Sequence, residues 1–290
     1  MAVEGLLLVD KPAGATSHDA VDAVRRALGT RKVGHAGTLD PMATGLLVIG
    51  VGRATRLLRF LGDLPKTYEG TARLGIETDT LDAQGRPLRT SEVRVTRSDV
   101  RRAMNALVGE SLQRPPAYSA VKVGGRKLYE AARAGERLEA APRPIRVEAF
   151  DLLGFDPPEV RFRVVCSGGT YVRALVADVG LALGCGAHLV RLVRTAIGPF
   201  RLQEAAPPDA PGPLLPVERA VAHLPRVDLG PEEARVARHG SILGPAGIEG
   251  PYAVFAPDGR LVGIYRDDGP KARPEVVLAT PAGVAPGVAT

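Results

Sequence analysis

The stretch GHAGTLDPMATGLLVIGVGRATR, residues 34–56, decides how we interpret the fold of this chain. Its first dozen residues contain three glycines and a single acidic residue, Asp40, with almost no bulky side chain. Asp40 precedes Pro41, and the residue before a proline is held in extended backbone. The apolar run that follows, residues 45–52, predicts a buried strand. A stiffly held carboxylate directly before a buried strand indicates the floor of a cleft, although Asp-Pro also starts ordinary turns.

The basic residues of the chain are mostly arginine and are concentrated in its first three quarters. The 290 residues carry a net charge of +6, with 32 arginines and 6 lysines. Residues 1–220 hold 31 basic and 24 acidic side chains, whereas residues 221–290 hold 7 and 8. The arginine fork binds phosphate oxygens and stacks on bases. A polyanion bound by the first part is therefore one hypothesis, and codon bias or a heat-adapted surface would give the same composition.

Cofactor and metal chemistry have no signature in this sequence. The five histidines are scattered without ligand spacing, and the two cysteines, Cys166 and Cys185, are too few for a disulfide framework or a structural zinc site. There is no phosphate-binding G-x-x-x-x-G-K-[ST] loop, dinucleotide fingerprint or G-x-S-x-G elbow. The chain also lacks a signal peptide and an apolar run near the ~20 residues of a membrane helix. We therefore expect no metal, no cofactor, no membrane and a cytoplasmic location.

Strand and helix patterns alternate irregularly along most of the chain. Apolar runs and period-two alternation predict strands at 5–11, 45–52, 66–75, 145–155 and 159–167. Helical spacing predicts helices from Thr16 or Ser17 to Gly29, over 53–61, from Ser98 to Gly109, and over 171–184. This order indicates an α+β fold with a central mixed or antiparallel sheet flanked by helices.

A segment rich in proline and alanine divides the chain into two predicted domains. It is EAAPPDAPGPLLP, residues 204–216, the best candidate for a linker. Beyond it, Pro257-Asp258-Gly259 stands between two alternating segments of residues 252–266, which predicts a hairpin. We expect a large domain over residues 1–220 and a small β-rich domain over residues 221–290, whose last residues, 280–290, form a tail.

Five segments resemble, in order and spacing, the motifs of the TruB family of tRNA pseudouridine synthases. They are DKPAGATSHDAV (10–21), the opening stretch (34–56), KTYEGTARLGIETDTLDAQG (66–85), QRPPAYSAVKVGGRKLYEAARAG (113–135) and CSGGTYVRALVADVGLALGCGAHLVRLVRTAIGPF (166–200). The resemblance extends from about residue 4 to residue 202. It implies a pseudouridine synthase fold with an RNA-side insertion at about 110–150 and a small C-terminal PUA-like RNA-binding domain.

The resemblance implies the isomerisation of uridine 55 to pseudouridine in the T arm of tRNA. The base leaves its ribose at N1, rotates and rejoins through C5 without a redox change, so neither cofactor nor metal is required. A uracil inside a folded RNA arm has to be flipped out to reach a protein nucleophile. The implied partner is the T-arm stem-loop of tRNA, with no obligatory protein partner and a monomeric enzyme.

The resemblance also assigns the residues that would carry this chemistry. Asp40 is the nucleophile, Tyr68 stacks on the target base and helps to remove the C5 proton, and Arg173 is the cation beside Asp40. Burial raises the pKa of a carboxyl group, and a neighbouring cation keeps the group ionised. Whether Asp40 attacks the base or the ribose C1′ is left open.

Five further positions follow from the same resemblance. Tyr171 and Leu192 match the lining of the uracil pocket, and His35 matches the histidine that packs within the T loop and holds the flipped state. Lys11 and Pro12 support the catalytic loop. Without the resemblance, each of the five would be interpreted as an ordinary core, loop or surface residue.

Exposed basic side chains are candidates for phosphate contacts, with a solvated surface as the alternative for each. They are Arg53, Arg56, Arg59, Arg101, Arg102, Lys122, Arg126 and Lys127. Two other functions stay open at this point. One is an RNA-binding or RNA-folding protein that uses the same surface without catalysis, and the other is a guide-RNA-dependent catalytic subunit.

Overall fold

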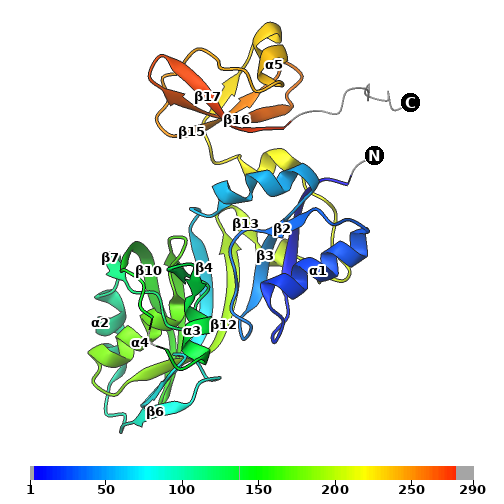
Figure 1. Cartoon of the computed structure of the whole chain (residues 1–290). Coiled ribbons are helices and arrows are strands. Elements are labelled where there is room, and N and C mark those ends of the chain that lie inside the picture. Colours follow the sequence, from blue (N-terminus) through cyan, green and yellow to red (C-terminus); the bar gives the residue numbers. More distant parts are fainter. Residues whose placement is uncertain (1–2, 137, 279–290) are drawn as a thin grey trace.

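A large mixed sheet forms the centre of the computed structural model, which describes residues 3–136 and 138–278 (Figure 1). Its nine strands are β1 (Gly5–Lys11), β2 (Val33–His35), β3 (Thr44–Val51), β4 (Lys66–Leu74), β7 (Gly109–Gln113), β10 (Arg143–Asp156), β11 (Glu159–Cys166), β12 (Ala187–Ile197) and β13 (Phe200–Arg201). The main order is β1-β3-β12-β4-β11-β10-β7. Strands β3 and β12 are parallel and the other neighbours are antiparallel, which confirms the predicted mixed sheet.

The remaining elements are short helices, two hairpins and a second sheet. The helices are α1 (Ser17–Leu28), α2 (Arg97–Asn105), α3 (Leu128–Arg133), α4 (Val172–Ala182) and α5 (Pro231–Ala237), with 3-10 helices η1 (Gly52–Leu61), η2 (Leu202–Glu204) and η3 (Val217–Ala220). The hairpins pair β5 (Ile76–Thr78) with β6 (Pro87–Thr90), and β8 (Lys122–Val123) with β9 (Arg126–Lys127). The second sheet contains β14 (Arg226–Asp228), β15 (Pro251–Phe255), β16 (Leu261–Asp268) and β17 (Lys271–Val277).

Strands β1 and β3 are apolar over their central residues, Leu6–Val9 and Leu46–Ile49, because both of their faces are buried there. Alternate residues such as Leu7 and Ile49 pack against α1, while Leu6 and Val48 face the cluster that contains η1. Strands that are covered on both faces read as continuous apolar runs. Asp40 therefore stands on a loop that leads into the most buried part of the molecule.

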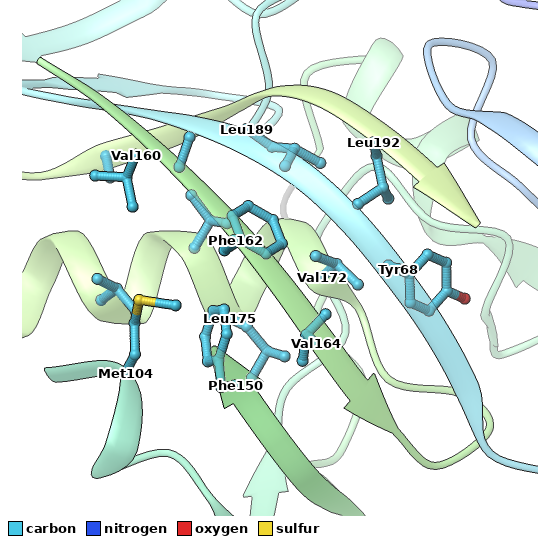
Figure 2. Close-up of a cluster of buried hydrophobic side chains, with 14 of the residues drawn as sticks. Tyr68, Met104, Phe150, Val160, Phe162, Val164, Val172, Leu175, Leu189 and Leu192 are labelled. Carbon is cyan, nitrogen blue, oxygen red and sulfur yellow. The ribbon is translucent and has the colours of Figure 1, made fainter. Parts of the chain in front are cut away.

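Strands β4, β11 and β12 are covered on one face only. Side chains of this face pack against α2 and α4, and Figure 2 shows Phe162, Leu175 and Met104 within that cluster. Phe150 and Phe162 meet edge to face, with ring centroids 5.5 Å apart. Tyr68 lies at one end of the cluster, and its hydroxyl points away from the other labelled side chains (Figure 2). The cluster thus ends at the place where β4 meets the 34–45 loop.

Helix α1 begins and ends as its sequence predicts, whereas α2 does not. Thr16 is the N-cap of α1, and Gly29 takes the left-handed conformation at its C-terminus, with φ 62°. The N-cap of α2 is Thr96, because its side chain accepts from the Asp99 N–H while the Asp99 carboxylate accepts from the Thr96 N–H. The predicted cap at Ser98 is wrong by two residues. The helix stops at Asn105, before the predicted end at Gly109, because Gly109 already begins β7.

The segment predicted as a linker is bonded to the edge of the large sheet. Ala206 and Leu215 exchange backbone hydrogen bonds with β1, including Leu6 N–H to the Leu215 carbonyl at 2.9 Å and Asp10 N–H to the Ala206 carbonyl at 2.9 Å. The prediction of a linker over 204–216 is therefore wrong. Proline removes donors but leaves carbonyls, so a proline-rich chain can still pair with an edge strand through its other residues.

The second sheet packs against the large domain through η1. Leu57 and Phe60 of η1 share one apolar cluster with Phe255 and Ile264. Two arginines of η1 reach the second sheet: Arg59 bonds the Glu275 carboxylate at 2.9 Å, and Arg56 donates to the Val277 carbonyl. The hairpin predicted over 252–266 is confirmed as β15–β16. The boundary at 220/221 stays a prediction, and the predicted tail lies outside the described residues.

Segment 110–150 begins and ends inside the large sheet. Its flanks, β7 and β10, pair with each other at the sheet edge, from Gly109 with Val147 to Gln113 with Arg143. The β8–β9 hairpin and α3 lie between them. Among the described residues, no helix is long and apolar enough to span a membrane.

Candidate active site

A cleft of about 250 Å³ opens at the end of the β4 core, beside the 34–45 loop. Four parts of the chain line it: the loop, β4, the end of β12 and the turn into α4, together with two residues of the 110–150 segment. The lining residues are Gly37, Thr38, Leu39, Asp40, Lys66, Tyr68, Ser119, Ala120, Gly169, Thr170, Tyr171, Val172, Leu192 and Arg194. Four of the residues that the sequence predicts for a site, Asp40, Tyr68, Tyr171 and Leu192, therefore meet in one cavity.

Asp40 presents its carboxylate to this cleft while a buried arginine holds it from below. The Asp40 side chain is 32% exposed and that of Arg173 only 4%. Arg173 Nε donates to Asp40 Oδ2 at 2.8 Å, and Nη2 donates to Oδ1 at 3.1 Å. A two-point contact of this kind fixes the orientation of a carboxylate as well as its charge. The predicted proximity of these residues, 133 positions apart, is present in the structure.

Arg173 is itself fixed by three partners besides Asp40. Nη1 donates to the Thr80 carbonyl at 2.8 Å and lies 3.5 Å from Oδ2 of Asp82, while Nη2 also donates to the Tyr118 carbonyl at 2.9 Å. Asp82 is buried and accepts from the Thr80 hydroxyl at 2.6 Å. The cation beneath Asp40 is thus balanced by a second carboxylate that the sequence analysis did not identify. Asp82 lies within the quoted 66–85 segment, but a polar turn gives no sign that one of its acids is buried.

The 34–45 loop is held in place by Ser17 and Lys11. The Ser17 hydroxyl accepts from the Leu39 N–H at 2.8 Å and donates to the Leu39 carbonyl at 3.2 Å. Nζ of Lys11, which is fully buried, donates to the carbonyls of Pro12 at 3.0 Å, Ala15 at 2.6 Å and Pro41 at 3.4 Å. Burial lowers the pKa of Lys11 to about 8, against the opposing attraction of Asp40. Pro12 is exposed and contributes through its carbonyl.

Arg194 is the second buried arginine of the site, and the sequence analysis did not identify it. Its Nε donates to the Leu46 carbonyl at 2.7 Å, and its other nitrogens donate to the carbonyls of Thr38 at 3.3 Å and Gly37 at 3.2 Å. It therefore ties β12 to both ends of the loop that carries Asp40. It is 1% exposed, so these backbone carbonyls are the partners that make its burial tolerable.

Tyr68 and Lys66 extend from alternate positions of β4 into the same cleft. Burial raises the pKa of Tyr68, and the Arg194 cation opposes the shift in part. The phenol is therefore neutral at pH 7. Burial lowers the pKa of Lys66 to about 8, and its Nζ donates to the carbonyls of Gly62 at 2.5 Å and Leu64 at 2.8 Å.

Of the remaining predicted residues, Tyr171 and Leu192 line the cleft, whereas His35 does not. Tyr171 is the residue before α4 and Leu192 lies on β12, so their side chains close the cleft from two sides. His35 ends β2 opposite Ile49 and is not among the lining residues. Burial and the Arg194 cation lower the pKa of His35, so it is neutral at pH 7. Among the described residues, its buried Nδ1 has no hydrogen-bond partner.

Three family profiles together cover most of the described chain. They are "TruB family pseudouridylate synthase (N terminal domain)" over residues 25–172, "tRNA pseudouridylate synthase B C-terminal domain" over 173–207, and "tRNA Pseudouridine synthase II, C terminal" over 224–279. The chain belongs to the TruB family of pseudouridylate synthases. The cleft that contains Asp40 is formed by residues of the first two of these TruB regions.

Curated TruB relatives match the chain over almost its full length. The tRNA pseudouridine synthase B of Mycobacterium sp. (strain KMS) is 49% identical over 96% of this chain and 97% of its own. The proteins of the same name from Aromatoleum aromaticum and Thermobifida fusca are 47% and 46% identical, over 92% and 95% of this chain and 90% and 99% of their own.

Solved structures confirm the predicted fold class. A chain of a Cbf5-Nop10-Gar1 complex matches with a TM-score of 0.74 at 27% identity, covering 94% of this chain and 84% of that one. A chain of an H/ACA RNP bound to a substrate RNA containing 2′-deoxyuridine matches with a TM-score of 0.72 at 26% identity, covering 96% and 85%. The TruB chain therefore has a pseudouridine synthase fold with a small C-terminal sheet domain.

Proposed function

We propose that this protein isomerises uridine 55 in the T loop of tRNA to pseudouridine, with Asp40 as the nucleophile. The observation that carries the proposal is the pairing of a cleft-facing carboxylate with a buried arginine on its far side. This arrangement leaves the cleft side of Asp40 free to attack. The relatives named tRNA pseudouridine synthase B support the choice of tRNA as substrate.

The proposed reaction needs one nucleophilic carboxylate. The N1–C1′ bond of the uridine breaks and a C5–C1′ bond forms, while C5 loses its proton and N1 gains one, so no electrons are exchanged with a co-reactant. A covalent adduct of Asp40 with either the base or C1′ retains the substrate while the base turns. Arg173 would keep Asp40 ionised and oriented through both stages.

The walls of the cleft suit a flipped pyrimidine. Tyr68 offers a buried aromatic face and Leu192 an apolar one, and Tyr171 closes the opening. A base that leaves its stack loses favourable contacts, and stacking on an aromatic side chain restores part of them. Tyr68 would also help to remove the C5 proton, the role that the family resemblance implies for it.

We propose direct recognition of the tRNA T arm by a cytoplasmic monomer. The 110–150 segment and the small C-terminal domain would lie along the RNA, with His35 packed within the T loop. Of the eight basic side chains considered for phosphate contacts, Arg56, Arg101 and Lys122 are exposed and make no ion pair with any described residue, but Arg56 donates to the Val277 carbonyl. Arg102, Arg126 and Lys127 are paired with Asp99, Glu136 and Glu130. Arg101 and Lys122, which have no such partner, are therefore the better candidates for phosphate contacts.

Release of tritium from tRNA labelled at C5 of uridine tests the proposal. The wild-type protein should release tritium from full-length tRNA and from an isolated T-arm stem-loop, because the determinants lie in that arm. Asp40→Asn should abolish release while tRNA affinity stays unchanged. Asp63→Asn, an exposed acid outside the cleft, is the matched control and should release tritium at the wild-type rate. Binding of tRNA without release by the wild type would instead support a purely RNA-binding role.

A further inference from the structure

Gln113 and Arg143 are direct neighbours at the edge of the large sheet, and both contact Tyr171. They are the last register pair between β7 and β10. The chain between them leaves the sheet, forms the β8–β9 hairpin and α3, and returns. Neither residue lines the cleft, yet the residue they share does.

The Gln113 side chain bonds both backbone polar groups of Tyr171, its N–H and its carbonyl. Its Oε1 accepts from the Tyr171 N–H at 2.8 Å, and its Nε2 donates to the Tyr171 carbonyl at 3.1 Å. The side chain is buried, with the residue only 5% exposed. Tyr171 is the N-cap position of α4 and supplies no side-chain cap of its own. Gln113 therefore fixes the backbone at the point where the chain enters the helix that carries Arg173.

Arg143 holds the ring of the same tyrosine. Its Nη2 donates to the Tyr171 hydroxyl at 3.1 Å, and its guanidinium carbon lies 5.3 Å from the ring centroid. A cation close to both the face and the hydroxyl of a tyrosine restricts the rotation of the ring. Arg143 also lies close to the cleft. Gly169 is one of the lining residues, and the position that a Cβ would take on Gly169 is 3.9 Å from Nη1 of Arg143.

We propose that Gln113 and Arg143 are positioning residues that clamp Tyr171 as a wall of the cleft. This inference rests on the proposed function, because it assigns a purpose to the Tyr171 position in that reaction. A displacement of about 1 Å in a substrate-positioning residue is enough to slow a reaction strongly. The clamp has two independent grips, one on the backbone and one on the ring. Its loss lowers the rate of the chemical step and leaves tRNA affinity, which phosphate contacts dominate, nearly unchanged.

A double-mutant cycle with Tyr171→Phe tests the Arg143 grip. In the wild-type background, Arg143→Ala should lower the single-turnover rate of tritium release about tenfold, as expected for the loss of one charge-assisted hydrogen bond. In the Tyr171→Phe background, which lacks the hydroxyl, the same change should cost about threefold or less. Arg143→Lys keeps one donor and should recover part of the rate. Gln113→Ala should lower the rate in both backgrounds, since it acts on the backbone.

Arg146→Ala is the matched control for the cycle. Arg146 lies on the same strand and is 63% exposed, and its Nη1 pairs with Glu110 of β7 at 3.1 Å without touching Tyr171. It should leave the rate unchanged. Equal losses for Arg143→Ala in both backgrounds, or a wild-type rate in Gln113→Ala, would overturn the clamp while the wild type remains active. Absence of release by the wild type would instead overturn the proposed function.

Discussion

Asp40 and Arg173 form a two-point ion pair in which the cation is buried and the carboxylate is partly exposed. The bonds are 2.8 Å and 3.1 Å long, and the remaining donors of Arg173 are occupied by the carbonyls of Thr80 and Tyr118. The position of the guanidinium is therefore fixed by the protein, and its charge is in place before the RNA binds. A preorganised charge costs no reorganisation at the moment of reaction.

Arg173→Lys should lower the single-turnover rate of tritium release about 10²-fold, because one ammonium group cannot make both bonds to Asp40. It would also leave the carbonyl of Thr80 or Tyr118 without its donor. Arg102→Lys, an exposed arginine paired with Asp99 on α2, is the matched control. A rate for Arg173→Lys within about threefold of the wild type would show that orientation by the fork is unimportant.

Asp82→Asn should weaken the support of Arg173 without touching Asp40. The amide keeps the oxygen that Thr80 uses but can place N–H groups against the Nη1 of Arg173, which is 3.5 Å from Asp82 Oδ2. We expect a loss of about 1–3 kcal/mol in the free energy of unfolding and a slower chemical step, with unchanged tRNA affinity. Urea unfolding and tritium release measure the two effects. Asp79→Asn, in the same hairpin but bonded to the exposed Arg86, should show neither.

Ser17→Ala should loosen the loop that carries Asp40. The substitution leaves the buried N–H and carbonyl of Leu39 without partners, which costs about 1–3 kcal/mol in the free energy of unfolding. The rate of tritium release should fall as well, since the loop also positions the carboxylate. Ser98→Ala, at an exposed serine in the first turn of α2, provides the comparison and should change neither quantity. A wild-type rate in Ser17→Ala would mean that Lys11 and Arg194 hold the loop without help.

The elements of the fold were predictable from the sequence wherever one local signal decided them. The apolar runs of β1 and β3, the Gly29 stop of α1 and the turn at 257–259 each follow from a few adjacent residues. The cap of α2 was misplaced because Thr96 and Ser98 are both capping residues, and only the bond to Asp99 distinguishes them. The 204–216 segment was misjudged because its composition does not show that β1 has a free edge there.

The residues of the candidate site were also predictable only in part. Asp40, Tyr68, Tyr171, Arg173 and Leu192 were identified through the family resemblance, and the structure brings them together. Asp82 and Arg194 were missed because their importance comes from burial, and a charged residue on a strand or turn is exposed by default. Gln113 was missed for the same reason, since an amide on an edge strand gives no sign of a bond to residue 171.

Lys122→Ala should reduce the salt dependence of tRNA binding more than Arg126→Ala does. Both residues lie in the β8–β9 hairpin, but Arg126 is bonded to Glu136 at 2.8 Å and 3.1 Å, whereas Lys122 is exposed and has no ion pair among the described residues. Loss of one phosphate contact lowers the slope of log affinity against log salt by about one. Titrations of binding at several salt concentrations measure the slope. Equal slopes for Lys122→Ala and the wild type would place the hairpin away from the RNA.

The stability of the protein relative to its Lys11→Met variant should increase as the pH rises from 8 to 10. Burial lowers the pKa of Lys11 to about 8, against 10.5 for an ordinary lysine. Between these values the unfolded chain keeps a proton that the folded chain has released, so the free energy of unfolding rises with pH, at most by about 1.4 kcal/mol per pH unit. Well below pH 8 both states are protonated and the cost of burying the ammonium group is fully present.

Lys11→Met retains the length of the side chain and removes the titrating group, so the difference between the two proteins isolates Lys11 from every other group that titrates in this range. Urea unfolding at pH 7, 8, 9 and 10 gives that difference. It should change little between pH 7 and 8 and then grow in favour of the wild type. A difference that stays constant up to pH 10 would mean that Lys11 keeps its proton in the folded state, held by the carbonyls of Pro12, Ala15 and Pro41 and by the charge of Asp40.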